Sequence, residues 1–139
     1  MAVERTLAMV KPDAMARGLQ GEILKRIHDA GFQIVAIKSL RLTKAEAEGF
    51  YAVHRGKSFF APLTEFMSSG KVVVAVLEAE GAIARWRETM GATDPAQAAP
   101  GTIRREFGAS IQNNCTHGSD APDTAAFEIG FFFSGHELL

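Results

Sequence analysis

The sequence predicts an α+β fold, in which helices cover an antiparallel sheet. Three observations support this prediction. The 139 residues are 47% hydrophobic and 22% charged, which suits one compact domain with a sizeable core. Short apolar runs typical of strands alternate with segments of helical apolar spacing. The longest wholly apolar run, residues 72–77, falls far short of the roughly 20 residues that cross a bilayer. We therefore expect residues 1–139 to form a single domain.

The first third of the chain predicts a strand, a helix and a second strand. Residues 6–10 form a strand-like apolar run that Pro12 ends, because proline lacks the N–H donor that a strand needs. Residues 21–30 carry apolar side chains at helical spacing, and Gly31 is placed to end that helix. Residues 33–42 alternate apolar and polar side chains, which indicates a half-exposed strand.

Two helices are expected next, before a buried strand. Thr43 followed by Glu46 is a capping-box pattern that opens a helix to about Val53, and residues 61–67 suit a second, short helix. Residues 71–78 contain four valines and a leucine, as expected of a central strand buried on both faces.

The last third predicts a helix, a long loop, a short strand and a final helix. Residues 82–90 suit a helix, and residues 91–101 are rich in Gly, Ala and Pro, which indicates a loop. A short strand could end at His117. Asp120 and Pro122 are typical of a helix start. They predict a helix that extends to about Phe132, with Asp120 as its N-terminal cap. The order strand, helix, strand, strand, helix, strand is that of a ferredoxin-like βαββαβ antiparallel sheet with additional helices.

His117 is the most informative residue, within residues 113–120 (NNCTHGSD). An imidazole at neutral pH is partly deprotonated, can attack phosphorus or carbonyl centres, and can be oriented through its second ring nitrogen. A lone histidine is more often structural, so partners of matching chemistry are needed. Lys11, Arg87 and Arg104 are candidate phosphate-binding cations because they lie at a strand end, near a helix end and just after the long loop.

The chain resembles the nucleoside diphosphate kinase family over essentially its whole length. The resemblance rests on several separated motifs in the right order: residues 4–13 (ERTLAMVKPD), 48–54 (EGFYAVH), 91–104 (GATDPAQAAPGTIR) and 114–120 (NCTHGSD). Such an ordered set is far more specific than any single motif. There is no P-loop pattern, so phosphate binding must rest on side chains.

The resemblance implies a ping-pong reaction that moves the γ-phosphoryl group of a nucleoside triphosphate, typically ATP, to a nucleoside diphosphate. His117 would attack through Nδ1 and become a phosphohistidine. Glu128 matches the carboxylate that orients the histidine, Tyr51 the active-site tyrosine, and Ser119 the serine beside the histidine that bonds Glu128. Lys11 is counted with these catalytic residues because it would lie near the bridging phosphate oxygen.

The resemblance also implies a nucleotide site. Arg87, Thr93 and Arg104 match the phosphate ligands, while Lys11 and Asn114 match the contacts to the ribose hydroxyls. Phe59 and Ile111 match the two side chains that sandwich the base, an apolar slot that accepts any planar ring. Mg²⁺ is the implied cofactor, held mainly by the nucleotide phosphates with no protein metal site. Ala121 stands where many relatives have serine, and Cys115 and Thr116 replace a pair that is commonly more apolar.

Charge, cysteine content and apolar runs limit the partners. The net charge of −1 argues against a dedicated nucleic-acid surface, and we expect a cytoplasmic protein that binds no membrane. We also expect a homo-oligomer, a tetramer in preference to a dimer or a hexamer.

Cys115 is the only cysteine, which excludes an intrachain disulfide but leaves a bond between subunits open. Zinc binding by His54, His117, His136 and Cys115 lacks ligand-like spacing, and Ser119 and Asp120 crowd His117 too closely for a hydrolase triad.

Two other functions compete with the enzyme. A binding or regulatory module could use the same nucleotide pocket to engage protein or nucleic acid. A histidine phosphocarrier, fed by a partner protein, would share His117 but would not need Phe59, Ile111, Lys11 and Asn114 to hold a nucleoside. The complete residue set favours the kinase over both.

Overall fold

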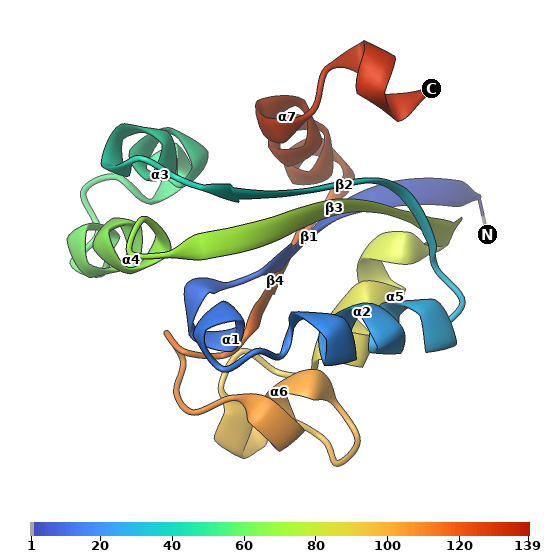
Figure 1. Cartoon of the computed structure of the whole chain (residues 1–139), viewed down its shortest axis with the longest axis horizontal. Coiled ribbons are helices and arrows are strands. Elements are labelled where there is room, and N and C mark those ends of the chain that lie inside the picture. The colour runs from blue at the N-terminus through green and yellow to red at the C-terminus, as the bar shows by residue number, and fades with distance from the viewer. Residues whose placement is uncertain (1) are drawn as a thin grey trace.

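The computed structural model describes residues 2–139 and contains a four-stranded sheet with helices on both faces (Figure 1). The strands are β1 (Val3–Val10), β2 (Gln33–Arg41), β3 (Lys71–Glu80) and β4 (Thr116–Gly118). Their order is β2-β3-β1-β4, and every neighbouring pair is antiparallel. This is the predicted ferredoxin-like arrangement, and both β3 and β1 are central.

Helices cover both faces of the sheet. They are α1 (Pro12–Ala16), α2 (Gln20–Asp29), α3 (Lys44–Phe50), α4 (Phe60–Met67), α5 (Ala82–Met90), α6 (Ile103–Phe107) and α7 (Pro122–Phe132), with short 3₁₀ turns η1 (Ala52–His54), η2 (Pro95–Gln97) and η3 (Gly135–Leu138). In Figure 1, α2 and α5 lie on the lower side of the sheet, while α3 and α7 lie on the upper side.

The apolar run of β1 is buried because its residues alternate between two cores. Leu7 and Met9 pack on the α3 and α7 side with Phe50, while Ala8 and Val10 pack on the α2 and α5 side. Since side chains of a strand point alternately to opposite faces, a central strand covered on both faces must be apolar throughout. The expectation for the strand of residues 71–78 is confirmed in the same way.

Local signals placed some element ends correctly and others wrongly. The capping box at Thr43 is present: its hydroxyl accepts from Glu46 N at 3.1 Å, and its N–H donates to the Glu46 carboxylate at 2.8 Å. The helix it opens was expected to reach about Val53. It ends instead at Phe50, and η1 follows after Tyr51.

Two helices of five residues each, α1 and α6, were not predicted. They are too short to display helical periodicity. Pro12, which was expected only to end a strand, also starts α1 as its first residue, where its missing N–H costs nothing. Thr102 caps α6 by accepting from Arg105 N at 3.3 Å.

The prediction that Asp120 caps the last helix is wrong. Helix α7 begins at Pro122 with Ala121 as its capping residue, and the Thr124 hydroxyl accepts from the Ala121 N–H at 2.9 Å. The carboxylate of Asp120 pairs with Arg87 instead. Across residues 2–139, none of the helices combines the length and the apolar character that a membrane span requires.

Gly118 on β4 lies where the neighbouring side chains leave no room for a Cβ. A Cβ at this position would lie 2.5 Å from Trp86 Cδ1 and 2.6 Å from Met90 Cε. Both neighbours are fully buried in a close-packed core, so they have little room to move away. We expect Gly118→Ala to lower the free energy of unfolding by about 1–3 kcal/mol, measured by chemical denaturation.

Gly21→Ala is the matched control, since a Cβ at Gly21 meets nothing within 4 Å. Alanine is the better helix former within α2, so this variant should be as stable as the parent or more stable by up to about 1 kcal/mol. Equal destabilisation of both variants would contradict the packing argument.

Candidate active site

A cavity of about 290 Å³ is lined by most of the site residues that the sequence analysis predicts. It is lined by Lys11, Tyr51, Arg87, Thr93, Arg104, Ile111, Asn114 and His117, together with His54, Leu63, Met90, Thr116, Gly118 and Asp120. A more apolar groove of about 400 Å³ adjoins it and shares Lys11, Leu63, Thr93 and Ile111 with it. Phe59 lines that groove. The folded chain therefore brings the predicted residues together from many separate segments.

The side chain of His117 is held by a carboxylate behind it. Strand β4 pairs His117 with Met9 of β1, and Trp86 Nε1 donates to the His117 carbonyl at 3.1 Å. On the ring, Nε2 lies 2.8 Å from Glu128 Oε1. A carboxylate oxygen accepts, so Nε2 carries the proton and donates it. Among residues 2–139, no side chain or backbone group hydrogen-bonds Nδ1, which is left as the unprotonated nitrogen.

Ser119 completes a short chain of hydrogen bonds that fixes Glu128. Its hydroxyl donates to the same Glu128 Oε1 at 2.9 Å and accepts from the Leu7 N–H at 3.2 Å. Ser119 is fully buried, and the Glu128 side chain is only 13% exposed. The orientation of His117 is therefore tied to the backbone of β1 as well as to α7.

Aromatic rings surround the histidine. The ring centroid of Tyr51 lies 6.1 Å from that of His117 with the planes near perpendicular, and Phe50 lies 5.4 Å from it. Burial, with a smaller contribution from the Glu128 charge, raises the pKa of the Tyr51 phenol well above its usual range. Tyr51 therefore keeps its proton at neutral pH.

Phe50 and His54 are site residues that the sequence interpretation missed. Phe50 is adjacent to Tyr51, and His54 stacks on Tyr51 with ring centroids 6.3 Å apart. Burial, and then the positive charge of Lys57, lowers the pKa of His54 below its ordinary value. The motif of residues 48–54 contains both positions, so the sequence carries the signal, although zinc binding is the only role that it suggests for His54.

Lys11 is a buried cation at the floor of the cavity. Its Nζ donates to Gln112 O and to Asn114 Oδ1, both at 2.8 Å, and Asn114 Nδ2 donates to Thr93 O at 3.0 Å. Burial lowers the pKa of Lys11 to about 8, and the positive charge of Arg104 adds to the effect, while Asp13 opposes it. This network joins the end of β1 to the loops that precede β4 and α6.

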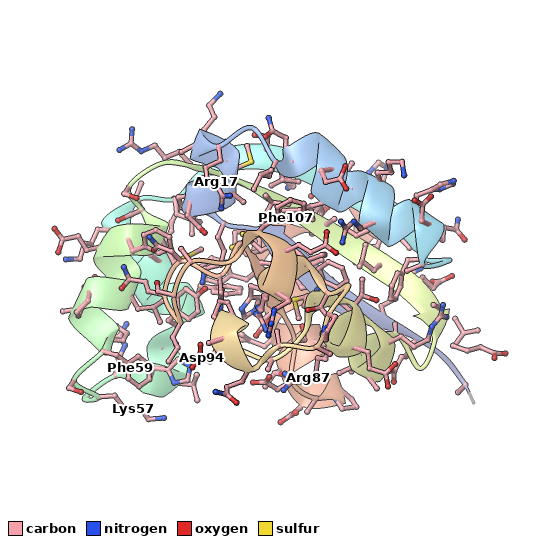
Figure 2. The ribbon with its side chains drawn as sticks, turned by 90° about the horizontal axis from the view of Figure 1, so that it is seen from below. Arg17, Lys57, Phe59, Arg87, Asp94 and Phe107 are labelled. Atoms are coloured by element: carbon pink, nitrogen blue, oxygen red, sulfur yellow. The ribbon has the colours of Figure 1, made fainter. Side chains whose placement is uncertain are left out.

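The two arginines have different environments. Arg104 is buried and donates to Gly91 O at 2.9 Å and to Thr116 O at 2.8 Å, and burial lowers its pKa to about 10. Arg87 is half-exposed and pairs with Asp120. Figure 2 shows Phe59, Asp94 and Arg87 along one side of the molecule. Three cations beside one cavity create a local site for an anion on a chain with almost no net charge.

The backbone just before His117 has an unusual conformation. Cys115 has a φ of 75°, and the Thr116 N–H donates to Asn114 O at 2.9 Å, a hydrogen bond that spans only three residues. These two features define the strained form of the γ-turn, which costs about 1–3 kcal/mol. Burial raises the pKa of the Cys115 thiol to about 11. Because Cys115 is fully buried, a disulfide between subunits would require this turn to open.

The side chains that line the cavity include one carboxylate, that of Asp120. Among residues 2–139, no three His, Cys, Asp or Glu side chains gather closely enough to hold a metal ion. Asp120 supplies a carboxylate in the cavity wall, and carboxylate oxygens suit Mg²⁺.

Known proteins are similar to this chain over nearly its whole length. Residues 4–138 match the family model described as nucleoside diphosphate kinase. Relatives with that name share 59% identity over 137 residues in Desulfotalea psychrophila (99% of this chain, 100% of the relative) and 60% over 139 residues in Dinoroseobacter shibae (100% and 99%). The structure of the Aquifex aeolicus nucleoside diphosphate kinase superposes with a TM-score of 0.97 at 53% identity, covering 99% of this chain and 100% of that one. The Halobacterium salinarum enzyme in complex with CDP gives 0.94 at 42% identity, covering 99% and 92%.

The lowered pKa of Lys11 predicts a specific dependence of stability on pH. The unfolded chain holds the Lys11 proton up to about pH 10.5, whereas the folded chain releases it near pH 8. Between these values the unfolded state binds more protons, so stability rises with pH. The difference in unfolding free energy between the parent and Lys11→Met should therefore move in favour of the parent by about 2 kcal/mol from pH 7 to pH 10.

Chemical denaturation monitored by Trp86 fluorescence at several pH values measures this difference. Lys11→Met is the reference because methionine keeps much of the apolar stem and does not titrate. Parallel pH profiles for the two proteins would contradict the assignment of a buried lysine that loses its proton near pH 8.

Proposed function

The chain belongs to the nucleoside diphosphate kinase family, and from this premise we propose that His117 carries the phosphoryl group between two nucleotides. The activity of the family is transfer of the γ-phosphoryl group from a nucleoside triphosphate to a nucleoside diphosphate by a ping-pong route. The observation that supports this role for His117 is the 2.8 Å contact between Nε2 and Glu128, which leaves Nδ1 as the nucleophile in the wall of the cavity.

The chemistry follows from that arrangement. The Nδ1 lone pair attacks the γ-phosphorus, and the bond from phosphorus to the bridging oxygen breaks, so the diphosphate leaves. The ring becomes positively charged, and the Glu128 carboxylate at Nε2 stabilises that charge. In the second half-reaction, a terminal oxygen of the incoming diphosphate attacks the phosphorus and the bond to Nδ1 breaks. Ser119 keeps Glu128 in place throughout.

Lys11, Arg87, Thr93 and Arg104 are proposed to bind the phosphates. Lys11 uses two of its three ammonium protons on Gln112 O and Asn114 Oδ1, so the third is shared between a phosphate oxygen and a ribose hydroxyl. Arg104 supplies positive charge although two of its nitrogens donate to backbone carbonyls, and its Nε has no hydrogen-bond partner among the described residues. Tyr51 packs against the imidazole as a protonated phenol.

The nucleoside is proposed to lie in the adjoining groove. Lys11 and Asn114 would contact the ribose hydroxyls, while Phe59 and Ile111 would hold the base between them. These two side chains are 47% and 60% exposed and line the same groove, so a planar ring would cover both of them on binding. The groove offers few polar groups to distinguish one base from another. The similar Halobacterium enzyme was solved with CDP.

Mg²⁺ is the proposed cofactor, held mainly by the phosphates of the nucleotide, with Asp120 as the carboxylate of the cavity wall available to it. When bound, it offsets the negative charge of the phosphate oxygens. Asp120 would also keep Arg87 near the same oxygens through their ion pair.

We also propose the domain organisation, the assembly and the location of the chain. Residues 1–139 are proposed to form one domain of a cytoplasmic homo-oligomer, a tetramer in preference to a dimer or a hexamer, without a dedicated nucleic-acid or membrane surface. The support for assembly is β2, an edge strand whose Ile37 is 46% exposed. An exposed edge with apolar side chains is a common site of strand pairing between subunits.

A labelling experiment tests the role of His117. The protein is mixed with Mg²⁺ and ATP labelled at the γ-phosphate, isolated, and chased with unlabelled purine and pyrimidine diphosphates. We expect acid-labile label on His117 that moves to both classes of diphosphate, and no label in His117→Ala although that variant still binds ADP. Because binding relies on other residues, loss of label with retained binding assigns chemistry to His117.

Other outcomes would favour the competing functions. Bound nucleotide without label on the parent protein would point to the binding module. Label that appears only with a phosphorylated partner protein, and not with ATP, would point to the phosphocarrier.

Glu128→Gln tests the carboxylate behind His117. Glutamine can still accept from Nε2 and Ser119, but it has no charge to stabilise the ring during transfer. We expect kcat to fall about 100-fold, with little change in the KM for nucleotides, measured by steady-state kinetics. Asp123→Asn on the same helix is the matched control, since Asp123 is exposed and makes no contact with His117. Equal rates for the parent and Glu128→Gln would exclude a role for the charge.

A further inference from the structure

The strained turn before His117 is held on both sides by one segment far away in the sequence. Cys115 is the one non-glycine residue among residues 2–139 with a positive φ. Its N–H donates to Asp13 Oδ2 at 3.1 Å, and its carbonyl accepts from the Lys11 N–H at 2.8 Å. Both backbone polar groups of the strained residue are thus bound by the chain where β1 leads into α1. Figure 1 shows α1 beside the start of β4.

The turn determines where β4 begins. After Cys115, Thr116 pairs with Val10, His117 pairs with Met9, and the strand ends at Gly118. A strand of three residues has few backbone bonds of its own with which to resist a change at its start. If Cys115 relaxed to a negative φ, the chain would leave the turn in another direction, and the imidazole two residues later would move with it.

We propose that Asp13 is a positioning residue for His117, because its carboxylate holds the strained γ-turn at Cys115 and so fixes the direction in which β4 delivers the imidazole. The inference rests on the proposed role of His117 and names a group that does not itself contact the nucleotide cavity. Asp13 lies in the first turn of α1, which begins at Pro12, so its backbone is itself constrained.

Asp13 also carries a negative charge, and the effect of this charge must be distinguished from that of its hydrogen bond to Cys115. Its negative charge raises the pKa of Lys11 and so favours the charged lysine. It also raises the pKa of the Cys115 thiol, after the larger effect of burial. Asp13→Asn removes the charge but keeps an oxygen that can accept from the Cys115 N–H. Asp13→Ala removes both the charge and the acceptor.

The test compares four variants by the rate of His117 phosphorylation in a single turnover with saturating ATP, and by the KM for nucleotides. They are Asp13→Ala, Asp13→Asn, and the double variants Asp13→Ala with Cys115→Gly and Asp13→Ala with Cys115→Ala. Glycine adopts a positive φ without strain, whereas alanine keeps the Cβ that causes the strain. Both double variants lose the buried thiol, so the lost packing of the thiol does not explain a difference between them.

We expect Asp13→Ala to lower the phosphorylation rate about tenfold with a smaller change in KM, and Asp13→Asn to stay within about threefold of the parent. Adding Cys115→Gly should restore the rate to within about threefold, while adding Cys115→Ala should not. A rate that falls equally in Asp13→Ala and Asp13→Asn, or that glycine and alanine restore equally, would overturn the proposal in favour of an effect of charge on Lys11 or of packing.

A spectroscopic reading gives the same answer without turnover. The NMR signal of the His117 Nε2 proton reports its hydrogen bond to Glu128 and should shift in Asp13→Ala, then return in the double variant with glycine only. If Asp13→Ala does not fold, Asp13→Ser replaces it, since a serine hydroxyl keeps a polar group in α1 but is shorter than the carboxylate. An unshifted proton signal in a folded Asp13 variant would overturn the proposal.

Failure of the proposed kinase function would give a different result from failure of the role of Asp13. If the parent protein took no label on His117 from ATP, the proposed function would fail whatever Asp13 does. If the parent is labelled and the glycine rescue is absent, only the role of Asp13 fails.

Discussion

The shared acceptor Glu128 Oε1 is the interaction on which the site depends. It receives hydrogen bonds from His117 Nε2 and from Ser119 Oγ at 2.8 and 2.9 Å. An imidazole has two chemically similar nitrogens, and a fixed carboxylate at one of them decides which is protonated and which is nucleophilic. Ser119 in turn binds the backbone of β1, so the choice of nitrogen is linked to the central strand of the sheet.

The fold supports this arrangement by burying the surroundings of β4 on both sides. Trp86 from α5 bonds the His117 carbonyl and leaves no room for a side chain at Gly118, while Phe50 from α3 and Tyr51 pack on the imidazole from the opposite face. The two hydrophobic cores therefore meet at β4. Close packing makes the position of the ring a consequence of the whole domain, because cores deform little under strain.

Several features of the site reduce the stability of the fold. Burial disfavours the charged forms of Lys11 and Arg104, as their lowered pKa values record, and Cys115 has a strained backbone. Strained and desolvated groups persist only where surrounding structure fixes them, and such groups concentrate at functional sites. Here the hydrogen bonds of Lys11 and of Asp13 provide that fixation, and both belong to the short segment after β1.

The sequence by itself determined the fold class and most of the proposed site. Apolar runs and, at residues 33–42, alternating apolar and polar residues identified the strands, and the capping box at Thr43 marked a helix start. These signals are local. The family resemblance selected His117, Glu128 and the cations. The tertiary structure alone decided that α1 and α6 are helices of one turn, that Asp120 pairs with Arg87, and that Phe50 and His54 surround Tyr51. It alone also decided that Cys115 is strained and bound by Asp13, which lies 102 residues earlier. No local pattern could predict this contact, because a hydrogen bond from a backbone N–H to a side chain so distant in the sequence depends on how β1 and β4 pair. That pairing exists only once the sheet has formed.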